Sequence, residues 1–306
     1  MDLFKDNNNI KKSDLNSENF SSSRLDNVKL IMEYAVKFGI FYESEDHIQL
    51  TDLGKDIQKN IGFFTWAVGG YGDFLRNFTE VNELNNITMS SMIDGANVAL
   101  GSRQANKQFM WDIIIDELSL LKAHNIADLG CGGAGAIIDI CKKFDEVSAT
   151  GIDISEKAIK SAKTNIEKNG LNNRVEVVNQ NVLDAIDSPY LIEKFSSVDT
   201  VLSFMMMHDL FNIRKPVDII KKLMSTFPQA KTFIIADTFL SEETSLKQNT
   251  PIFTYGFEFV HHFMKIKLFH KQEYIKYFSD SGLRVEKVTY LNVPNTYLFV
   301  LKRDLV

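Results

Sequence analysis

The chain has 306 residues, of which 44% are hydrophobic and 24% charged, with a formal net charge of -6 and a pI of about 5.6. These values are typical of a globular protein with one large or two medium domains. The acidic balance argues against a general nucleic-acid binder, because such proteins present basic surfaces. No apolar run approaches the roughly 18 residues of a membrane span, and the polar N-terminus lacks a signal-peptide pattern. We therefore expect a cytoplasmic protein that binds neither nucleic acid nor membranes.

The N-terminal part of the chain combines a polar tail with a short helical and β pattern. Residues 1–20 are rich in Asn, Asp, Ser and Lys, which predicts a disordered tail. From Leu25 onward apolar residues recur at helical spacing, and Gly39 ends the predicted helix. Residues 40–50 then predict two short strands around a charged turn, and Thr51 is a suitable cap for another helix.

An aromatic-rich segment, residues 62–118, follows and is interrupted by the glycine-dense sequence 68–72. We expect most of its aromatic side chains in the core of a helical linker and one or two in a substrate pocket. Arg103 has no obvious local partner, so it is either a surface arginine or a clamp on a substrate carboxylate, which a guanidinium fork matches. These patterns predict a helical domain over residues 21–118 and a second domain over residues 119–306.

Residues 126–153 have the pattern of a βαβ nucleotide-binding unit. Ile126–Leu129 is typical of a buried strand, and Ala134–Lys143 has apolar residues at helical spacing. A second strand delivers Asp153 at its carboxyl end, where the acid can accept both hydroxyls of a ribose. Glycines between strand and helix let the backbone lie against a ligand, because no Cβ intervenes. These glycines are Gly130, Gly132 and Gly135.

The glycine spacing alone also fits the dinucleotide fingerprint, so two further features decide the ligand. Asp128 stands two residues before the first glycine, where a carboxylate can meet an amine or a sulfonium. The chain ends in a predicted hairpin over residues 285–301. The stretch 128–135, together with Gly-Ile-Asp at 151–153, resembles the class I S-adenosylmethionine-dependent methyltransferases. This resemblance implies an α/β, Rossmann-like sheet of seven strands with the last one antiparallel, and S-adenosylmethionine as the cofactor.

Further strands are predicted at 175–178, 198–204 and 231–236. In the methyltransferase family an acid or amide after the third strand meets the adenine amino group, which here is Asn181 or, as an alternative, Gln180. The resemblance therefore implies a cofactor site made of Asp128, Gly130, Gly132, Asp153, Ile154, Asn181, Val182 and Phe204.

The N-terminal pattern carries a resemblance of its own. Its helix, short hairpin and Leu-Thr-Asp-Leu-Gly sequence at 50–54 resemble the winged-helix domain of small-molecule O- and C-methyltransferases. In that family the domain dimerises and covers the active site, so the resemblance implies a homodimer. A winged-helix regulator that senses S-adenosylmethionine is another reading, which the acidic balance disfavours.

Three histidines carry the candidate chemistry. His208 and Asp209 follow the fourth strand, at the sheet edge where ligands of open α/β folds bind. His261 and His262 lie in a long aromatic insertion, residues 238–269. From the residues alone, the histidines are structural, or His208 is a general base for a hydroxyl, or His208 and His261 bind a metal such as Fe, Zn or Ni.

A second resemblance favours the metal. Gly-Gly-Tyr-Gly at 69–72, His208-Asp209 and Val-His at 260–261 resemble bacterial 2-oxo acid C-methyltransferases, including the phenylpyruvate enzymes of peptide natural-product biosynthesis. The resemblance implies iron or a similar ion on His208 and His261, with Arg103 at the substrate carboxylate. Asp209 would bind the metal through water or accept the β-carbon proton. We expect metal-assisted C-methylation of a 2-oxo acid. The alternative is O- or N-methylation of a small aromatic metabolite with His208 as base and no metal.

Overall fold

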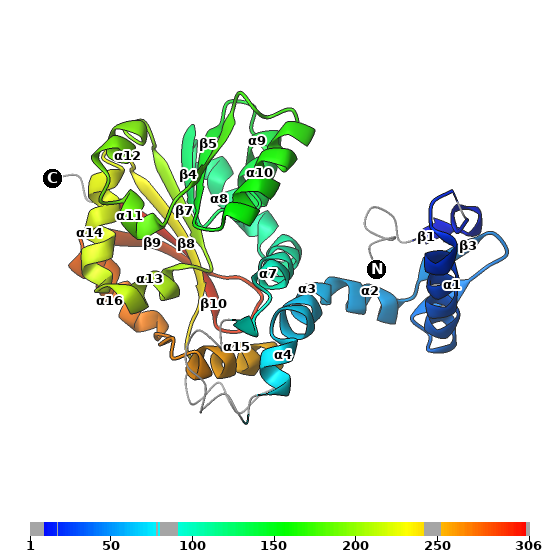
Figure 1. Ribbon diagram of the computed structural model, residues 1–306. Helices are drawn as coiled ribbons and strands as arrows, with labels where there is room; N and C mark the ends of the chain where they lie inside the picture. Colours follow the sequence, from blue (N-terminus) through cyan, green and yellow to red (C-terminus); the bar gives the residue numbers. More distant parts are fainter. Residues whose placement is uncertain (1–8, 17, 78, 80–90, 242–251, 304–306) are drawn as a thin grey trace.

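The computed structural model describes residues 9–16, 18–77, 79, 91–241 and 252–303. Its largest part is a mixed sheet with the strand order β6-β5-β4-β7-β8-β10-β9 and helices on both faces (Figure 1). The strands are β4 (Asn125–Leu129), β5 (Ser148–Asp153), β6 (Val175–Asn179), β7 (Thr200–Phe204), β8 (Thr232–Thr238), β9 (Leu283–Tyr290) and β10 (Thr296–Arg303).

The sheet has the predicted seven strands, and β10 is antiparallel to both of its neighbours, β8 and β9. Strands β6, β5, β4, β7 and β8 run parallel to one another. Every residue of β8 is buried, because helices cover both faces of the sheet, and this is why the central strands are nearly continuous apolar runs. All the strands predicted from residue 126 onward are present, with bounds that agree within two residues.

Two sets of helices enclose the sheet (Figure 1). One face is covered by α8 (Trp111–Leu121), α9 (Gly135–Lys143) and α10 (Glu156–Lys168). The other face is covered by α11 (Val182–Ala185), α12 (Pro189–Lys194), α13 (Met207–Ile213), α14 (Pro216–Thr226) and α16 (Lys271–Asp280).

Helix α8 belongs to the sheet domain. Its residues Ile114 and Leu118 pack in one core with Ile126 of β4. The domain boundary that we predicted at residue 118 therefore falls inside α8, and the division of the chain into domains stays a prediction.

The N-terminal module has a small core of its own. Strands β1 (Asn9–Lys11), β2 (Phe41–Glu43) and β3 (His47–Leu50) form a sheet in the order β1-β3-β2. Helix α1 (Ser22–Lys37) packs beside this sheet, and a short 3-10 helix, η2 (Lys12–Asp14), follows β1. Thr51 caps α2 (Asp52–Lys59) as predicted, since its side chain accepts a hydrogen bond from the Gly54 amide at 3.1 Å. In Figure 1 this module lies apart from the sheet domain.

Part of the predicted disordered tail is ordered, which corrects our prediction for residues 9–16 and 18–20. Asn9–Lys11 pairs antiparallel with β3, and Ile10 and Leu15 contact the small core. These two apolar residues are enough to dock a short segment onto an existing sheet edge. Residues 1–8 and 17 lie outside the described part of the chain.

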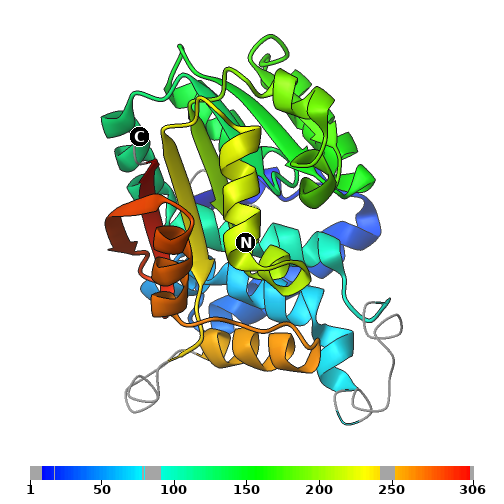
Figure 2. The ribbon, with the colours of Figure 1, turned by 90° about the vertical axis from the view of Figure 1, so that its left-hand side faces the viewer.

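Helices from two segments that are far apart in sequence lie together outside the sheet. The first group is α3 (Ile61–Phe64), the π-helix η3 (Thr65–Gly70), α4 (Gly72–Arg76) and α7 (Gly95–Phe109). The second is α15 (Ile252–Phe263), which lies beside α4 in both Figure 1 and Figure 2. Trp66, Phe74, Phe257 and Val260 share one apolar cluster, so this part of the aromatic-rich segment is core as expected.

Helix α7 crosses the linker helices at backbone contact distance. A Cβ placed on Gly101 would lie 2.5 Å from the Trp66 amide nitrogen and 2.7 Å from the Gly62 carbonyl oxygen. Backbone atoms cannot move aside as a flexible side chain can. Glycine at this position therefore determines how closely α7 approaches η3.

We predict that Gly101→Ala lowers the free energy of unfolding by about 1–3 kcal/mol, the usual cost of overpacking. Gly95→Ala in the same helix is the matched control, because a Cβ there meets nothing within 4 Å. Chemical denaturation of both variants measures the effect. Equal stabilities for the two variants would show that the close helix crossing is not required.

Candidate active site

The first of two adjacent cavities lies between α7 and the carboxyl ends of β4, β5 and β7. Five residues that we predicted at the cofactor line it: Asp128, Gly130, Gly132, Asp153 and Phe204. The other three predicted residues do not line this cavity. Ile154 is exposed at the end of β5, Val182 is buried, and the Asn181 side chain accepts a hydrogen bond from the Leu183 amide. Their contact with adenine stays a prediction.

The glycine turn fixes the acid that is predicted to bind ribose. Gly130 has a φ of +76°, and a Cβ on it would lie 2.7 Å from the Met206 sulfur. The Gly132 amide donates to Asp153 Oδ2 at 2.8 Å, and the Ser155 amide donates to Oδ1 at 2.8 Å. A carboxylate has about four acceptor positions, so Asp153 keeps free positions for two ribose hydroxyls.

Asp128 gives the cavity its preference for a cation. Its side chain is buried, and desolvation, together with the nearby Asp153 carboxylate, raises its pKa to about 8. A sulfonium or an ammonium group in the cavity would stabilise the ionised carboxylate. The site therefore suits a nucleoside that carries positive charge.

The second cavity shares a wall with the first. Val98, Ser102, Asn106 and Met205 line both cavities, so α7 and the end of β7 stand between the two cavities. Met205 has a φ of +57°, a strained conformation that recurs at functional sites. The other lining residues include the apolar Phe63, Trp66, Met110, Phe257 and Val293 and the polar Tyr71, His208, Asp209, Thr238 and His261.

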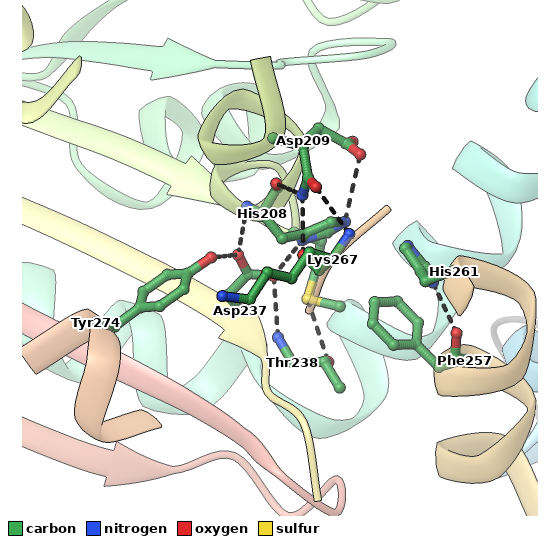
Figure 3. Close-up of polar contacts among 10 residues, drawn as sticks. His208, Asp209, Asp237, Thr238, Phe257, His261, Lys267 and Tyr274 are labelled. Atoms are coloured by element: carbon green, nitrogen blue, oxygen red, sulfur yellow. Dashed lines mark hydrogen bonds and ion pairs between the residues drawn. The ribbon is translucent and has the colours of Figure 1, made fainter. Parts of the chain in front are cut away.

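A buried carboxylate holds His208 in place (Figure 3). His208 Nδ1 donates to Asp237 Oδ1 at 2.7 Å, and the His208 amide donates to Oδ2 at 3.0 Å. The Tyr274 hydroxyl donates to the same Oδ2 at 2.8 Å. Burial lowers the pKa of His208, but the Asp237 charge outweighs burial and raises the pKa to about 9. Nε2 of His208 faces the cavity side, 3.7 Å from Asp209 Oδ1.

His261 lies opposite on α15, with its ring centre 5.1 Å from that of His208 (Figure 3). Its Nδ1 donates to the Phe257 carbonyl at 2.7 Å, so its Nε2 keeps a lone pair. Burial and the neighbouring His208 lower the pKa of His261 to about 4. His262 is exposed and lines a different, apolar hollow, so His261 is the histidine that meets His208.

Arg103 lines the cofactor cavity. Its guanidinium lies over Gly135, where a Cβ would be 2.3 Å from Arg103 Cζ. Arg103 does not line the second cavity, which contains His208 and Asp209; the preceding residue, Ser102, does. The structure thus brings His208, Asp209 and His261 together and places Arg103 on the other side of the shared wall.

Sequence reasoning missed Asp237, Tyr274 and Tyr71. Asp237 had a signal: it is an acid within the apolar strand pattern of β8, and a buried charge needs partners. Tyr274 had none, because its approach to the site depends on tertiary packing. Tyr71 lies in the aromatic-rich segment and in Gly-Gly-Tyr-Gly at 69–72, but no pattern singled it out from the other aromatic residues.

Two negative findings apply to the described residues. No group of three or more His, Cys, Asp or Glu side chains is arranged there to hold a metal ion. No described helix is long and apolar enough to cross a membrane.

A sheet with this strand order, with one cavity at the glycine turn and a second cavity beside it, is typical of a class I methyltransferase. Residues 120–274 match the model of a family described as Methyltransferase domain. The chain belongs to this family, and it is an S-adenosylmethionine-dependent methyltransferase.

Individual proteins agree with this assignment. The indolepyruvate C-methyltransferase of Streptomyces griseus is 23% identical over 272 residues, which cover 89% of this chain and 79% of that protein. The riboflavin-derivative dimethyltransferase of Streptomyces davawensis has a TM-score of 0.60 at 13% identity, covering 99% and 91% of the two chains. Human N-acetylserotonin methyltransferase, solved with S-adenosylmethionine, has a TM-score of 0.62 at 10% identity, covering 92% and 84%. These two structures share the fold.

We predict that Asp237→Asn lowers turnover about 10- to 100-fold, the usual cost of removing a group that orients a functional histidine. An amide offers a single acceptor oxygen, so either His208 or a buried backbone amide loses its partner. Turnover kinetics and calorimetric affinity for S-adenosylmethionine measure the effect, and we expect that affinity to stay unchanged.

Asp199→Asn is the matched control for this prediction. The Asp199 carboxylate accepts hydrogen bonds from the backbone amides of His124 and Asn125, away from both cavities. It should lose stability and keep turnover. Full turnover in Asp237→Asn would contradict the orienting role.

Proposed function

We propose that this enzyme methylates the β-carbon of an aryl 2-oxo acid beside a metal ion held by His208 and His261, in natural-product biosynthesis. One observation carries the proposal. Both imidazoles have their Nδ1 atoms engaged, by Asp237 and by the Phe257 carbonyl, so each offers Nε2 in the cavity next to the cofactor. Such anchoring is typical of metal-ligating histidines.

The chemistry of the donor set fits the proposed ion. Two imidazoles suit iron, zinc or nickel and leave coordination positions for a chelating substrate. His208, whose pKa is about 9, would release its Nε2 proton when the ion binds. When bound, the metal would supply Lewis-acid stabilisation of negative charge on the ketone oxygen, worth several kcal/mol. The β-carbon of a 2-oxo acid needs this stabilisation, because its hydrogen is only weakly acidic.

The substrate class is supported by a relative and by the cavity wall. The Streptomyces griseus relative is named for indolepyruvate, which is an aryl 2-oxo acid. In this chain, Phe63, Trp66 and Phe257 form an apolar wall that suits a flat ring. The polar end of the cavity, at His208 and Asp209, then receives the oxo acid group.

The chain's own residues position the reactants and move the proton. Ser102, Asn106 and Met205 line both cavities, so the acceptor and the cofactor would lie next to each other, with the β-carbon facing the sulfonium methyl in line. The carbon–carbon bond forms as the carbon–sulfur bond breaks, and S-adenosylhomocysteine leaves. We assign the β-carbon proton to Asp209, whose carboxylate stands beside His208. For Arg103 to reach the substrate carboxylate, its side chain would have to move from Gly135 past Ser102.

We also propose that residues 21–118 include a winged-helix-like module through which the enzyme forms a homodimer. The order of α1, the β2–β3 hairpin and α2 supports it. One face of α1, extended by its C-cap residue, leaves four large apolar side chains more than half exposed, which is typical of a protein interface. They are Leu30, Ile31, Tyr34 and Phe38.

A second candidate function is O- or N-methylation of a small aromatic metabolite without a metal. The observation that favours it is the His208–Asp237 pair, because a base oriented by a buried carboxylate is the usual device for activating a hydroxyl. His261 would then be a wall residue.

Histidine variants separate the two functions. We predict about one iron, zinc or nickel ion per chain in the reconstituted protein by elemental analysis. His208→Ala and His261→Ala should lose both the metal and arylpyruvate turnover. His262→Ala is the matched control and should retain both, since His262 faces the other hollow. If the protein contains no metal and the His261→Ala variant still methylates a phenol, the second function is supported instead.

A further inference from the structure

Tyr71 is a buried phenol whose hydroxyl has no hydrogen-bond partner in the described part of the chain. The side chain is 5% exposed and lines the acceptor cavity together with His208, Asp209 and His261. A buried tyrosine hydroxyl normally finds a partner. The other deeply buried tyrosine in this region, Tyr274, follows that rule and donates to Asp237.

Complete enclosure by protein atoms does not explain why the Tyr71 hydroxyl lacks a hydrogen-bond partner. Among the described residues, the enclosed and unpaired side-chain oxygens belong to Gln104, Ser203 and Thr289. The Tyr71 hydroxyl is not one of them, so it is not fully enclosed, and Tyr71 lines the acceptor cavity. Its free donor therefore points to a ligand.

The ring of Tyr71 is held firmly, which makes the hydroxyl a fixed donor. It packs on Trp66 with ring centres 4.5 Å apart and meets the edge of Phe74 at 6.4 Å. Burial, and secondarily the Asp209 charge, raise the pKa of Tyr71 to about 12, so the phenol stays protonated near neutral pH. A neutral, oriented O–H group can donate to an oxygen of the acceptor.

We propose that the Tyr71 hydroxyl donates a hydrogen bond to an oxygen of the 2-oxo acid and is a substrate-binding residue supplied by the linker helices. This inference rests on the proposed substrate class. It also accounts for how the acid is held in a cavity that no described arginine lines, since Arg103 lines the other cavity. Tyr71 thereby couples the N-terminal segment to recognition of the acceptor.

The test compares Tyr71→Phe with wild type by calorimetry, using metal-reconstituted protein saturated with S-adenosylhomocysteine and phenylpyruvate as the ligand. Phenylalanine keeps the ring packing and removes only the donor. We expect phenylpyruvate to bind at least about tenfold more weakly, the usual effect of losing a hydrogen bond to a charged group. Affinity for S-adenosylhomocysteine and the melting temperature should not change. Tyr290→Phe, at an exposed tyrosine, is the control and should match wild type.

A second ligand, 3-phenylpropionate, lacks the ketone and therefore shows which oxygen accepts the hydrogen bond from Tyr71. Equal losses for both acids support donation to the carboxylate, and a loss confined to phenylpyruvate supports donation to the ketone oxygen. Wild-type affinity in Tyr71→Phe, or an equal loss of S-adenosylhomocysteine affinity, would overturn the role of Tyr71 alone. If wild type neither binds nor methylates any aryl 2-oxo acid, both this inference and the proposed function fail.

Discussion

The site depends on one buried carboxylate, Asp237, at the end of β8. It accepts hydrogen bonds from the His208 side chain and amide, from the Thr238 amide and from the Tyr274 hydroxyl. A buried charge is tolerated only when it is paired and fully hydrogen-bonded, so these donors and the carboxylate require one another. Through them α13 and α16 are tied to the sheet, and the direction of the His208 ring follows from that arrangement.

The second constraint is the position of α7. Backbone contact at Gly101 holds it against the linker helices, while its Ser102 and Asn106 form the wall between the two cavities. The aromatic cluster around Trp66 and Phe257 joins the same helices to α15, which carries His261. The acceptor cavity is therefore built between three segments that are far apart in sequence, and its shape depends on how closely they pack.

The nucleotide half was predictable from the sequence because its signals are local. Strand periodicity, a glycine turn and an acid at a strand end each depend only on residues close together in sequence. The bounds of the observed strands agree with the predicted bounds within two residues. The N-terminal strand β1 was missed, since Ile10 and Leu15 are too few for a periodic pattern. Asp237 was missed, and Tyr71 was not singled out within the aromatic-rich segment, because their roles arise from contacts between distant elements. The position of His208 at the sheet edge was predictable from the strand pattern, whereas the choice of His261 over His262 came from resemblance.

The central claim is that the methyl group goes to carbon. The most direct measurement supplies S-adenosylmethionine labelled with ¹³C in its methyl group, together with phenylpyruvate, and locates the label in the product by NMR. The account predicts a methyl signal split by a proton on the adjacent β-carbon. A methyl signal without such splitting, at the shift of an oxygen-bound carbon, would contradict it.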